Sequence, residues 1–498
     1  MKAALLKRIL SISLAILLLG VTLVSCSDGT GGQTADTTSA GQSASDDTGE
    51  VDTRVYPELP DMDFDGYTFK VLHWYVTGWD HRMNKDIFAE VETGDPINDA
   101  VYKRNSIIND KYNVNFSIQN EPHNEVISMT QKFVNAGEDA YDVVYARMVD
   151  VTSLLTGGYF LDLNTLPYVD FSKPWWDHNS VERLSVLGKL YLVASDINII
   201  DKDATAAIAF NKQYAAEEQL PNLYELVENG TWTMDKMMSL YKGKSRDLNG
   251  DGQIDADNDV YAFLGKHDVA ASFFLGGGGS FVSKDENDEP YLSFESERNY
   301  NIAQKIFDIM YDEHHFYNQH LMQKTIDDYA FEQLFPNGHG LFYWMRLDNV
   351  TTMRASETDF GILPIPKYDE AQTRYYSMVS VHTSGLITVP KTAQDPGRTG
   401  FILEALSAES KYTLIPAYIE VALKGKYVRD NESEAMLDLI FATRTYDLGD
   451  VFNFGSLAGD WIGIAGTGNR DVASFYARHE KAAQKAIDKF IEQLQKYE

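Results

Sequence analysis

The acidic stretch from Asp247 to Asp255 has the spacing of a calcium-binding loop. Oxygen ligands at positions 1, 3, 5, 7 and 9 would come from Asp247, Asn249, Asp251, Gln253 and Asp255. A glycine stands at position 6, as the sharp turn of such loops requires. Position 12 is Asn258 instead of glutamate, so we expect weak binding. The sequence predicts structural calcium here, and an acidic hairpin without an ion is the alternative.

The sequence offers no arrangement typical of an enzyme. It has no G-x-S-x-G or H-E-x-x-H motif, and the pair His314 and His315 is isolated. The glycine run 276–279 lacks the following Lys-Ser/Thr of a phosphate loop, so we expect no redox or nucleotide cofactor. We therefore predict a protein that is not an enzyme. Because a glycosidase carboxylate pair follows no sequence spacing, a secreted polysaccharide-active enzyme stays open as an alternative.

The N-terminus has the features of an export signal. Lys2, Lys7 and Arg8 precede the apolar run 9–24, which is short for a spanning helix. Residues 23–26 read Leu-Val-Ser-Cys, which resembles the lipobox of bacterial lipoproteins. The resemblance implies that residues 1–25 are a signal peptide and that Cys26 carries acyl chains such as palmitate. An ordinary signal peptide with an incidental cysteine and an uncleaved anchor are the alternatives.

A polar segment separates Cys26 from the first predicted strand. From Ser27 to about Arg54 it consists mainly of Ser, Thr, Gly, Asp, Ala and Gln, with no aromatic residue. Such a composition cannot bury enough surface to offset the entropy of ordering. We therefore predict that residues 26–60 comprise the lipidated cysteine and a flexible linker. A coil of this length would hold the folded part about 30 Å from the membrane.

Composition restricts the partners. With 74 acidic against 43 basic residues, the formal net charge is -31, which disfavours nucleic acid and favours a neutral or cationic solute. The single cysteine excludes an intramolecular disulfide. With 498 residues, 44% of them hydrophobic, the chain can form two or three domains.

Predicted strands and helices alternate in the part of the chain that would position a binding site. Tyr67 to Tyr75 is predicted to be a strand, and Asp95 with Pro96 is predicted to begin a helix. Residues 114–118 alternate as a half-buried strand, and the apolar run 141–145 suits an interior parallel strand. After Asp471, apolar residues at helical spacing predict a terminal helix. The pattern indicates an open α/β lobe that binds ligands at the carboxyl ends of its strands.

Seven segments in the middle of the chain resemble the family 1 extracellular solute-binding proteins of ABC importers, the group that includes maltodextrin-binding proteins. In family order they are 141–145 (YDVVY), 158–163 (GYFLDL), 188–193 (GKLYLV), 207–212 (AIAFNK), 231–235 (TWTMD), 338–342 (GHGLF) and 360–366 (FGILPIP). Phe210 replaces the usual tyrosine, and the usual proline of the first crossing is missing.

The resemblance implies a two-lobed α/β periplasmic-binding-protein-like fold of type II, whose lobes are joined by crossing hinge strands. Residues 61–195 and 376–425 would form lobe 1, and residues 196–375 and 426–498 would form lobe 2. The strands that connect the lobes would lie near 193–204, 365–378 and 420–430. We also expect a monomer, and the lipobox-like residues 23–26 imply that it is lipid-anchored on the extracytoplasmic face of the cell membrane. There it would deliver a solute to permease subunits.

A sugar-binding site needs flat apolar faces for the rings and planar polar groups for the hydroxyls. Under the resemblance, the candidates are Trp74, Trp79, Tyr145, Arg147, Asp196, Asn198, Trp344, Arg346, His382 and Trp461. We expect Trp74 and Trp344 to sandwich a sugar ring, and packing in the core is the alternative for each aromatic residue. The predicted solute is an oligosaccharide, with peptide, polyamine or another solute open. For the whole protein, a surface adhesion or signalling module is a further alternative.

Overall fold

The computed structural model describes residues 54–76, 85–255, 258–319, 328–353, 358–423, 431–464 and 466–497. Contacts divide the chain into Met1–Arg54 and Val55–Glu498, and the described helices and strands all lie in the second unit. The predicted signal peptide, Cys26, most of the linker and Trp79 lie outside the described residues. Among the described residues, no helix is both long enough and apolar enough to span a membrane.

The first sheet is mixed and has the strand order β12-β3-β1-β2. Its strands are β1 (Tyr67–Tyr75), β2 (Val114–Pro122), β3 (Val143–Arg147) and β12 (Gly385–Thr388). β1 runs parallel to β2 and β3, and β12 is antiparallel to β3. The strand predicted from Tyr67 to Tyr75 is confirmed. In β3, the four residues before Arg147 are buried, as expected for an interior strand covered on both faces.

The second sheet has the order β10-β4-β9-β5-β8. Its strands are β4 (Ala206–Asn211), β5 (Tyr261–Gly265), β8 (Phe316–Asn318), β9 (Gly340–Arg346) and β10 (Phe360–Leu363). β5 is parallel to β8 and β9, whereas β4 is antiparallel to β9 and β10. The carboxyl ends of β5 and β9 therefore share one edge of this sheet.

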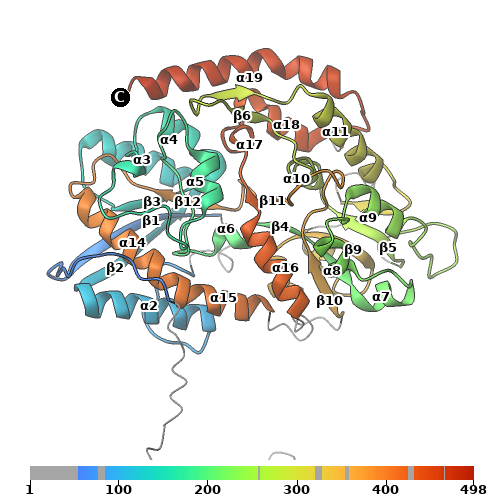
Figure 1. Ribbon diagram of the computed structural model, residues 1–498, viewed down its shortest axis with the longest axis horizontal. Coiled ribbons are helices and arrows are strands. Elements are labelled where there is room, and N and C mark those ends of the chain that lie inside the picture. The colour runs from blue at the N-terminus through green and yellow to red at the C-terminus, as the bar shows by residue number, and fades with distance from the viewer. Residues whose placement is uncertain are drawn as a thin grey trace, which may run out of the picture. The chain divides into compact units, whose positions relative to one another are not determined.

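Helices cover both sheets (Figure 1). Those that accompany the first sheet are α2 (Pro96–Tyr112), α3 (His123–Ala136), α4 (Thr152–Thr156), α5 (His178–Leu184), α14 (Pro396–Tyr412) and α15 (Leu414–Leu423). Those that accompany the second are α7 (Lys212–Glu217), α8 (Leu223–Glu228), α9 (Met234–Tyr241), α10 (Val269–Gly276), α11 (Glu297–Met310), α12 (Asp328–Leu334), α13 (Asn349–Met353), α16 (Asn431–Ala442), α18 (Leu457–Ile464) and α19 (Val472–Gln495). The helix start predicted at Asp95 is confirmed, because its carboxylate accepts N–H bonds from Ile97 and Asn98.

Several short elements connect the longer helices and strands of the two sheets. The connecting elements are η2 (Met148–Asp150), η3 (Leu163–Thr165), α6 (Ile200–Asp203), β11 (Ser377–Met378), β13 (Arg444–Thr445), α17 (Leu448–Phe452) and η4 (Phe454–Ser456), with the hairpin β6 (Val282–Lys284) and β7 (Pro290–Leu292). β11 pairs in parallel with β13, and Thr205 bridges to Val379. α15 packs on α2, beside the first sheet, and α16 packs on β10 of the second sheet. The chain therefore passes from the first sheet to the second between α15 and α16.

The strands of the first sheet all come from the segments predicted for lobe 1, and those of the second from 196–375. The limits of the lobes themselves stay a prediction. Most of the third predicted connection between the lobes, residues 424–430, lies outside the described residues.

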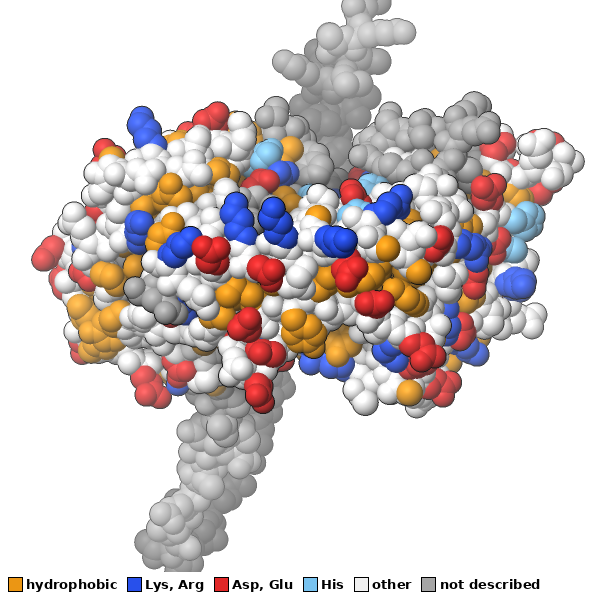
Figure 2. Space-filling view, turned by 90° about the horizontal axis from the view of Figure 1, so that it is seen from above, with side chains coloured by type: hydrophobic (Ala, Val, Ile, Leu, Met, Phe, Trp, Pro, Cys, Tyr) orange, Lys and Arg blue, Asp and Glu red, His pale blue; other side chains and the backbone are white. Residues whose placement is uncertain are grey.

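The terminal helix α19 begins at Val472, as its apolar spacing predicts, with Asp471 as the N-cap. Its buried residues pack on rings of neighbouring elements: Phe475 on Trp461, and Phe490 on Phe452. The opposite face of α19 is exposed and charged. Seen from above, basic and acidic side chains are interspersed on this side of the molecule (Figure 2). The large negative net charge is therefore not concentrated there in one patch.

Candidate functional site

An arginine and an aspartate meet at the carboxyl end of β3. Arg147 Nε donates to Asp150 Oδ2 at 2.6 Å, and its Nη2 donates to Oδ1 at 2.9 Å. His123 Nδ1 lies 2.8 Å from the same Oδ2. The two ionic side chains are 18% and 24% exposed, so this fork is held in place yet remains reachable from solvent. Open α/β sheets bind ligands at this end of their strands.

A second group of charges lies at the carboxyl ends of β5 and β9. Arg346, the last residue of β9, donates to Asp348 at 3.2 Å. Burial disfavours the charged form of Arg346, but Asp348 and Asp268 outweigh it and raise its pKa. β5 ends at Gly265, and three residues on, Asp268 lies 3.7 Å from His267.

His382 connects the two groups. The backbone N–H of Val149 donates to the carbonyl of Val381 at 3.1 Å, which holds this histidine beside the end of β3. Its side chain is exposed, but enough atoms surround it that burial lowers the pKa of His382. Asp268 acts against that shift, and Arg147 adds to it. The lowered pKa favours the neutral imidazole of His382, which can both donate and accept a hydrogen bond.

We call these side chains the strand-end cluster. Its members are Arg147, Asp150, His267, Asp268, Arg346, Asp348, His382 and Asp450. Asp450 belongs to it because its helix, α17, packs against η2, which ends at Asp150. Burial, with the charges of Asp447 and Asp268, raises the pKa of Asp450 to about 8. Asp268 acts electrostatically on His382, Arg346 and Asp450 alike, so it is the residue that the members share.

The cluster combines forked ion pairs with a neutral histidine and a protonated carboxyl. Each ion pair neutralises its own charge, and Arg147 has five N–H donors, of which Asp150 accepts two. Such groups can bind hydroxyls in fixed directions without retaining a free ion. The sequence predicted Arg147, Arg346 and His382. His382 interacts electrostatically with Arg147 and Asp268, and Asp268 also interacts with Arg346.

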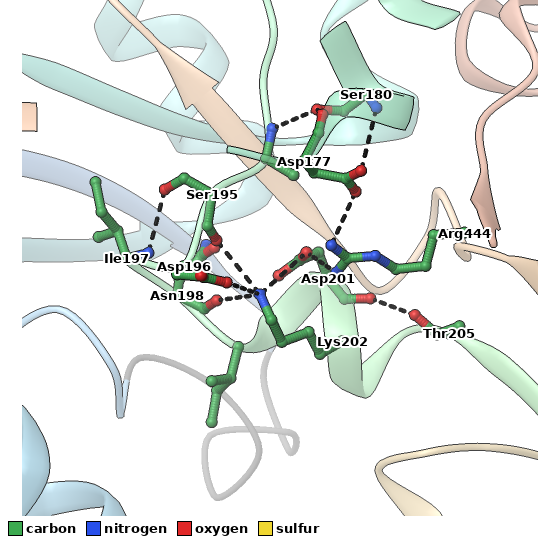
Figure 3. Close-up of polar contacts among 12 residues, drawn as sticks. Asp177, Ser180, Ser195, Asp196, Ile197, Asn198, Asp201, Lys202, Thr205 and Arg444 are labelled. Carbon is green, nitrogen blue, oxygen red and sulfur yellow. Dashed lines mark hydrogen bonds and ion pairs between the residues drawn. The ribbon is translucent and has the colours of Figure 1, made fainter. Parts of the chain in front are cut away.

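Asp196 and Asn198 lie in a different place, a buried ionic network at the first passage between the sheets (Figure 3). Lys202 Nζ lies 3.3 Å from Asp196 and 3.7 Å from Asp201. Arg444 of β13 binds Asp201 and also contacts Asp177 at 2.9 Å. We call Asp177, Asp196, Asp201, Lys202 and Arg444 the hinge network. Asn198 contributes its backbone carbonyl to Lys202 at 3.3 Å.

The aromatic candidates are in the core. Trp74 is 0% exposed, Tyr145 1%, Trp344 3% and Trp461 0%. The indole of Trp344 donates to Ser272 at 2.7 Å, and that of Trp461 donates to the carbonyl of Ala270 at 3.0 Å.

The indole of Trp74 occupies the space over Gly385, where a Cβ would lie 2.2 Å from its Nε1. In this conformation neither Trp74 nor Trp344 presents a ring face to a solute. Their burial therefore favours packing over the expected sandwich.

The predicted calcium loop directs its oxygens inward. Asp247 accepts N–H bonds from Gly250 at 2.6 Å and Gly252 at 2.7 Å, and Asp251 accepts one from Gln253 at 2.8 Å. In the described part of the chain, no group of three or more Asp, Glu, His or Cys side chains is placed to hold a metal ion. Residues 256–257, inside the loop, are not described. Calcium binding therefore stays a prediction.

The residues that sequence reasoning missed follow the ends of strands. Asp150 follows β3 by three residues, and His267 and Asp268 follow β5 by two and three residues. The strand-end rule that selected Arg147 would have selected them, had Tyr261–Gly265 been recognised as a strand. Asp450 carried no such signal, because it reaches the cluster from a short helix near the C-terminus.

Two large pockets are lined by residues outside the cluster. One of 760 Å³ lies between the 181–190 segment and the β6–β7 hairpin, where Lys284 Nζ contacts Ser185 Oγ at 2.7 Å. The other, of 680 Å³, lies at the end of β4, beside Arg246. The guanidinium of Arg246 stacks on the ring of Tyr214 at 3.8 Å. Neither includes a predicted ligand residue.

No protein-family model matches the sequence, and no curated protein matches it. Solved structures do match. The sugar-binding protein MalE of Xanthomonas citri aligns with a TM-score of 0.55 at 12% identity, over 86% of this chain and 98% of that one. A cyclo/maltodextrin-binding protein in complex with maltotetraose aligns with a TM-score of 0.52 at 13% identity, over 87% and 98%.

An ABC substrate-binding protein of Listeria monocytogenes in complex with cycloalternan gives 0.51 at 11% identity, over 87% and 99%. At such identities the likeness shows the fold. The chain thus has the two-lobed, periplasmic-binding-protein-like α/β fold that its sequence resemblance predicts.

Proposed function

We propose that this chain is an extracytoplasmic solute-binding lipoprotein that captures an oligosaccharide and delivers it to the permease of an ABC importer. The observation that carries the proposal is the strand-end cluster, to which both sheets and a passage between them contribute. The structures that share the fold are described as sugar-binding or substrate-binding proteins, and those named here with a ligand hold saccharides.

The chemistry of the cluster suits a polyhydroxylated, uncharged chain. Arg147 from the first sheet and Arg346 from the second are each paired with an aspartate, so neither needs an anionic ligand to balance its charge. Neutral His382 can donate to one hydroxyl or accept from another. A saccharide bound to both sheets would favour the conformation in which the two sets of side chains are closest.

Capture and release then depend on the hinge and do not require a chemical step. The solute would bind the closed conformation more tightly than the open one and so favour closure. The paired strands β11 and β13 would keep the two lobes connected in both conformations. Acyl chains on Cys26 would keep the protein at the membrane, and residues 26–60 would give it the reach to dock on the permease as a monomer.

A screen of saccharides by thermal shift, followed by calorimetry, tests the proposal. Arg147→Ala and Arg346→Ala each remove charged hydrogen bonds, so each should weaken binding of the saccharide found by about 1.5 to 3 kcal/mol. Arg470→Ala is the matched control, because Arg470 pairs with Asp308 at the surface with 47% and 55% of the two side chains exposed. Its affinity should stay unchanged.

Scattering should show a more compact particle when the saccharide is bound. Conversion of the saccharide to products would contradict the proposal, and so would full affinity in both arginine variants.

A further inference from the structure

The tip of the β6–β7 hairpin is bonded to a turn at residues 185–188. Lys284 Nζ donates to the carbonyl of Ser185 at 3.0 Å and to its Oγ at 2.7 Å, and it pairs with Asp288 at 2.5 Å. Asp288 accepts from Ser185 Oγ at 3.1 Å and from the N–H of Gly188 at 3.2 Å. The N–H of Leu187 donates to the carbonyl of Asp288 at 2.9 Å. We call Lys284, Asp288 and the turn 185–188 the hairpin latch.

Each end of the hairpin latch is fixed to the surroundings of a different sheet. The chain after the turn joins the first sheet, because Val193 bridges to Ile387 of β12. The hairpin belongs with the second sheet, because Phe281, directly before β6, packs on Phe274 of α10 with ring centroids 4.8 Å apart. The latch therefore connects the two sides of the molecule through side chains and turns, at a place where the backbone does not cross.

The 760 Å³ pocket lies beside the hairpin latch and is lined from both sides. Leu190 comes from the side of the turn, and Tyr291 comes from the hairpin. Because this space separates the two segments, polar bonds and not close apolar packing hold them together. Such bonds can be exchanged for bonds to water at a modest net cost, so the latch can open without the loss of a packed interface.

The hairpin is also bonded to the helix that approaches the strand-end cluster. Asp447, the N-cap of α17, accepts from Ser280 Oγ at 2.7 Å and from the N–H of Phe281 at 3.0 Å. Figure 1 shows β6 beside α17, and the two elements are in contact. α17 in turn packs against η2, which ends at Asp150. A separation of the two sides at the latch would therefore also separate α17 from the cluster residues that follow β3.

We propose that the hairpin latch is a conformational lock that holds the two lobes in the conformation that binds the solute, and that breaks when the solute is released. The inference goes beyond the proposed function, and only its affinity readout rests on that function. A latch formed without solute raises the fraction of the protein that is already competent to bind. Because apparent affinity scales with this fraction, the latch would set the affinity without touching the solute.

Distances between two spin labels measure the latched and open populations without any solute. The labels would be attached at Lys132→Cys on α3 and Glu228→Cys on α8, which are both exposed, in a Cys26→Ser background that has no other cysteine. Lys284→Met keeps the length of the side chain and removes its charge. Loss of a charge-assisted hydrogen bond should shift the ratio of the two populations about tenfold toward the open one.

Lys305→Met is the matched control. Lys305 pairs with Asp235 at the same 2.5 Å, but both residues lie on helices that accompany the second sheet, so this pair does not join the two sides. Its distance distribution should equal that of the wild type. For the saccharide found in the screen, calorimetry on Lys284→Met should show an affinity that falls by the same factor as the latched fraction. Urea unfolding checks that each variant is folded.

A second variant makes the test independent of Lys284. Asp288→Asn removes the other charge of the pair, and asparagine tolerates the left-handed backbone of this position, so this variant should fold and should shift the populations in the same direction. An unchanged distance distribution in either folded variant would overturn the inference, and so would a shifted distribution with full affinity. If no saccharide binds the wild type, the proposed function fails, whereas the distance distribution still decides whether the latch holds the lobes.

Discussion

Replacing Arg444 by methionine would remove the cation at the centre of the hinge network. Arg444 contacts Asp177 at 2.9 Å and binds Asp201, and the three side chains are 7%, 3% and 0% exposed. The burial of both carboxylates means that neither can regain water without local unfolding. Methionine retains the apolar length of the side chain, so the loss is electrostatic.

The remaining partners set the size of the effect. Asp177 would keep the Tyr446 hydroxyl at 2.9 Å and two backbone N–H groups. Among the residues that the structure describes, the carboxylate of Asp201 would keep only Lys202, at 3.7 Å. Removing one partner of a buried ion pair costs about 3 to 5 kcal/mol. Because one of the two carboxylates stays well satisfied, we expect the free energy of unfolding to fall by about 3 kcal/mol.

Urea unfolding of Arg444→Met and of Arg470→Met measures the difference. The surface pair of Arg470 with Asp308 should contribute less than about 1 kcal/mol. Adding Asp201→Asn to Arg444→Met should restore part of the lost stability, because it removes the uncompensated charge. A fall of less than 1 kcal/mol in Arg444→Met, or no recovery in the double variant, would refute the reasoning.

Three further outcomes are expected. Burial raises the pKa of Glu404 from 4.5 in the unfolded chain to about 7 in the folded protein. The stability that the protonated carboxyl allows is therefore fully present below pH 4.5 and is lost as the pH rises through 7. Glu404→Gln, which can still accept the Trp176 indole N–H, should flatten this dependence by on the order of 2 kcal/mol in urea melts at several pH values. If calcium binds the 247–255 loop, chelation should lower the melting temperature of the wild type, and Asp251→Ala should show no such response. Cys26→Ser should release the protein from membranes or leave it unprocessed, and palmitate label persisting on this variant would contradict lipidation at Cys26.

Much of the backbone was predictable because local signals agree with the fold. The β-branched and aromatic run of β1 and the Asp95-Pro96 cap of α2 each act within a few residues, so their effect does not depend on distant parts of the chain. The same holds for the apolar face of α19. Arg147 could be selected as a candidate from the sequence because it comes at the end of an apolar run that predicts a buried strand.

The aromatic residues were not predictable in this way. Trp74 is buried because its indole covers Gly385, a residue that lies far away in sequence and leaves the space by lacking a side chain. Trp344 is buried because Ser272 of α10 satisfies its N–H. Asp450 reaches the strand-end cluster from α17. In each case the decisive neighbour comes from another part of the chain, so the spacing of nearby residues carries no information about it.

The late position of β12 in the chain affects the order of folding. The hydroxyl of Thr388 donates to the carbonyl of Val144 across 244 residues of sequence. A nascent chain that has released β1, β2 and β3 still has an open edge at β3, and that edge is closed only after the whole second sheet has emerged. Loop closure over this distance is slow, and contacts of such long range delay folding. We therefore expect the first half of the chain to remain unfolded until synthesis is nearly complete, a property compatible with passage through a narrow channel as an extended polypeptide.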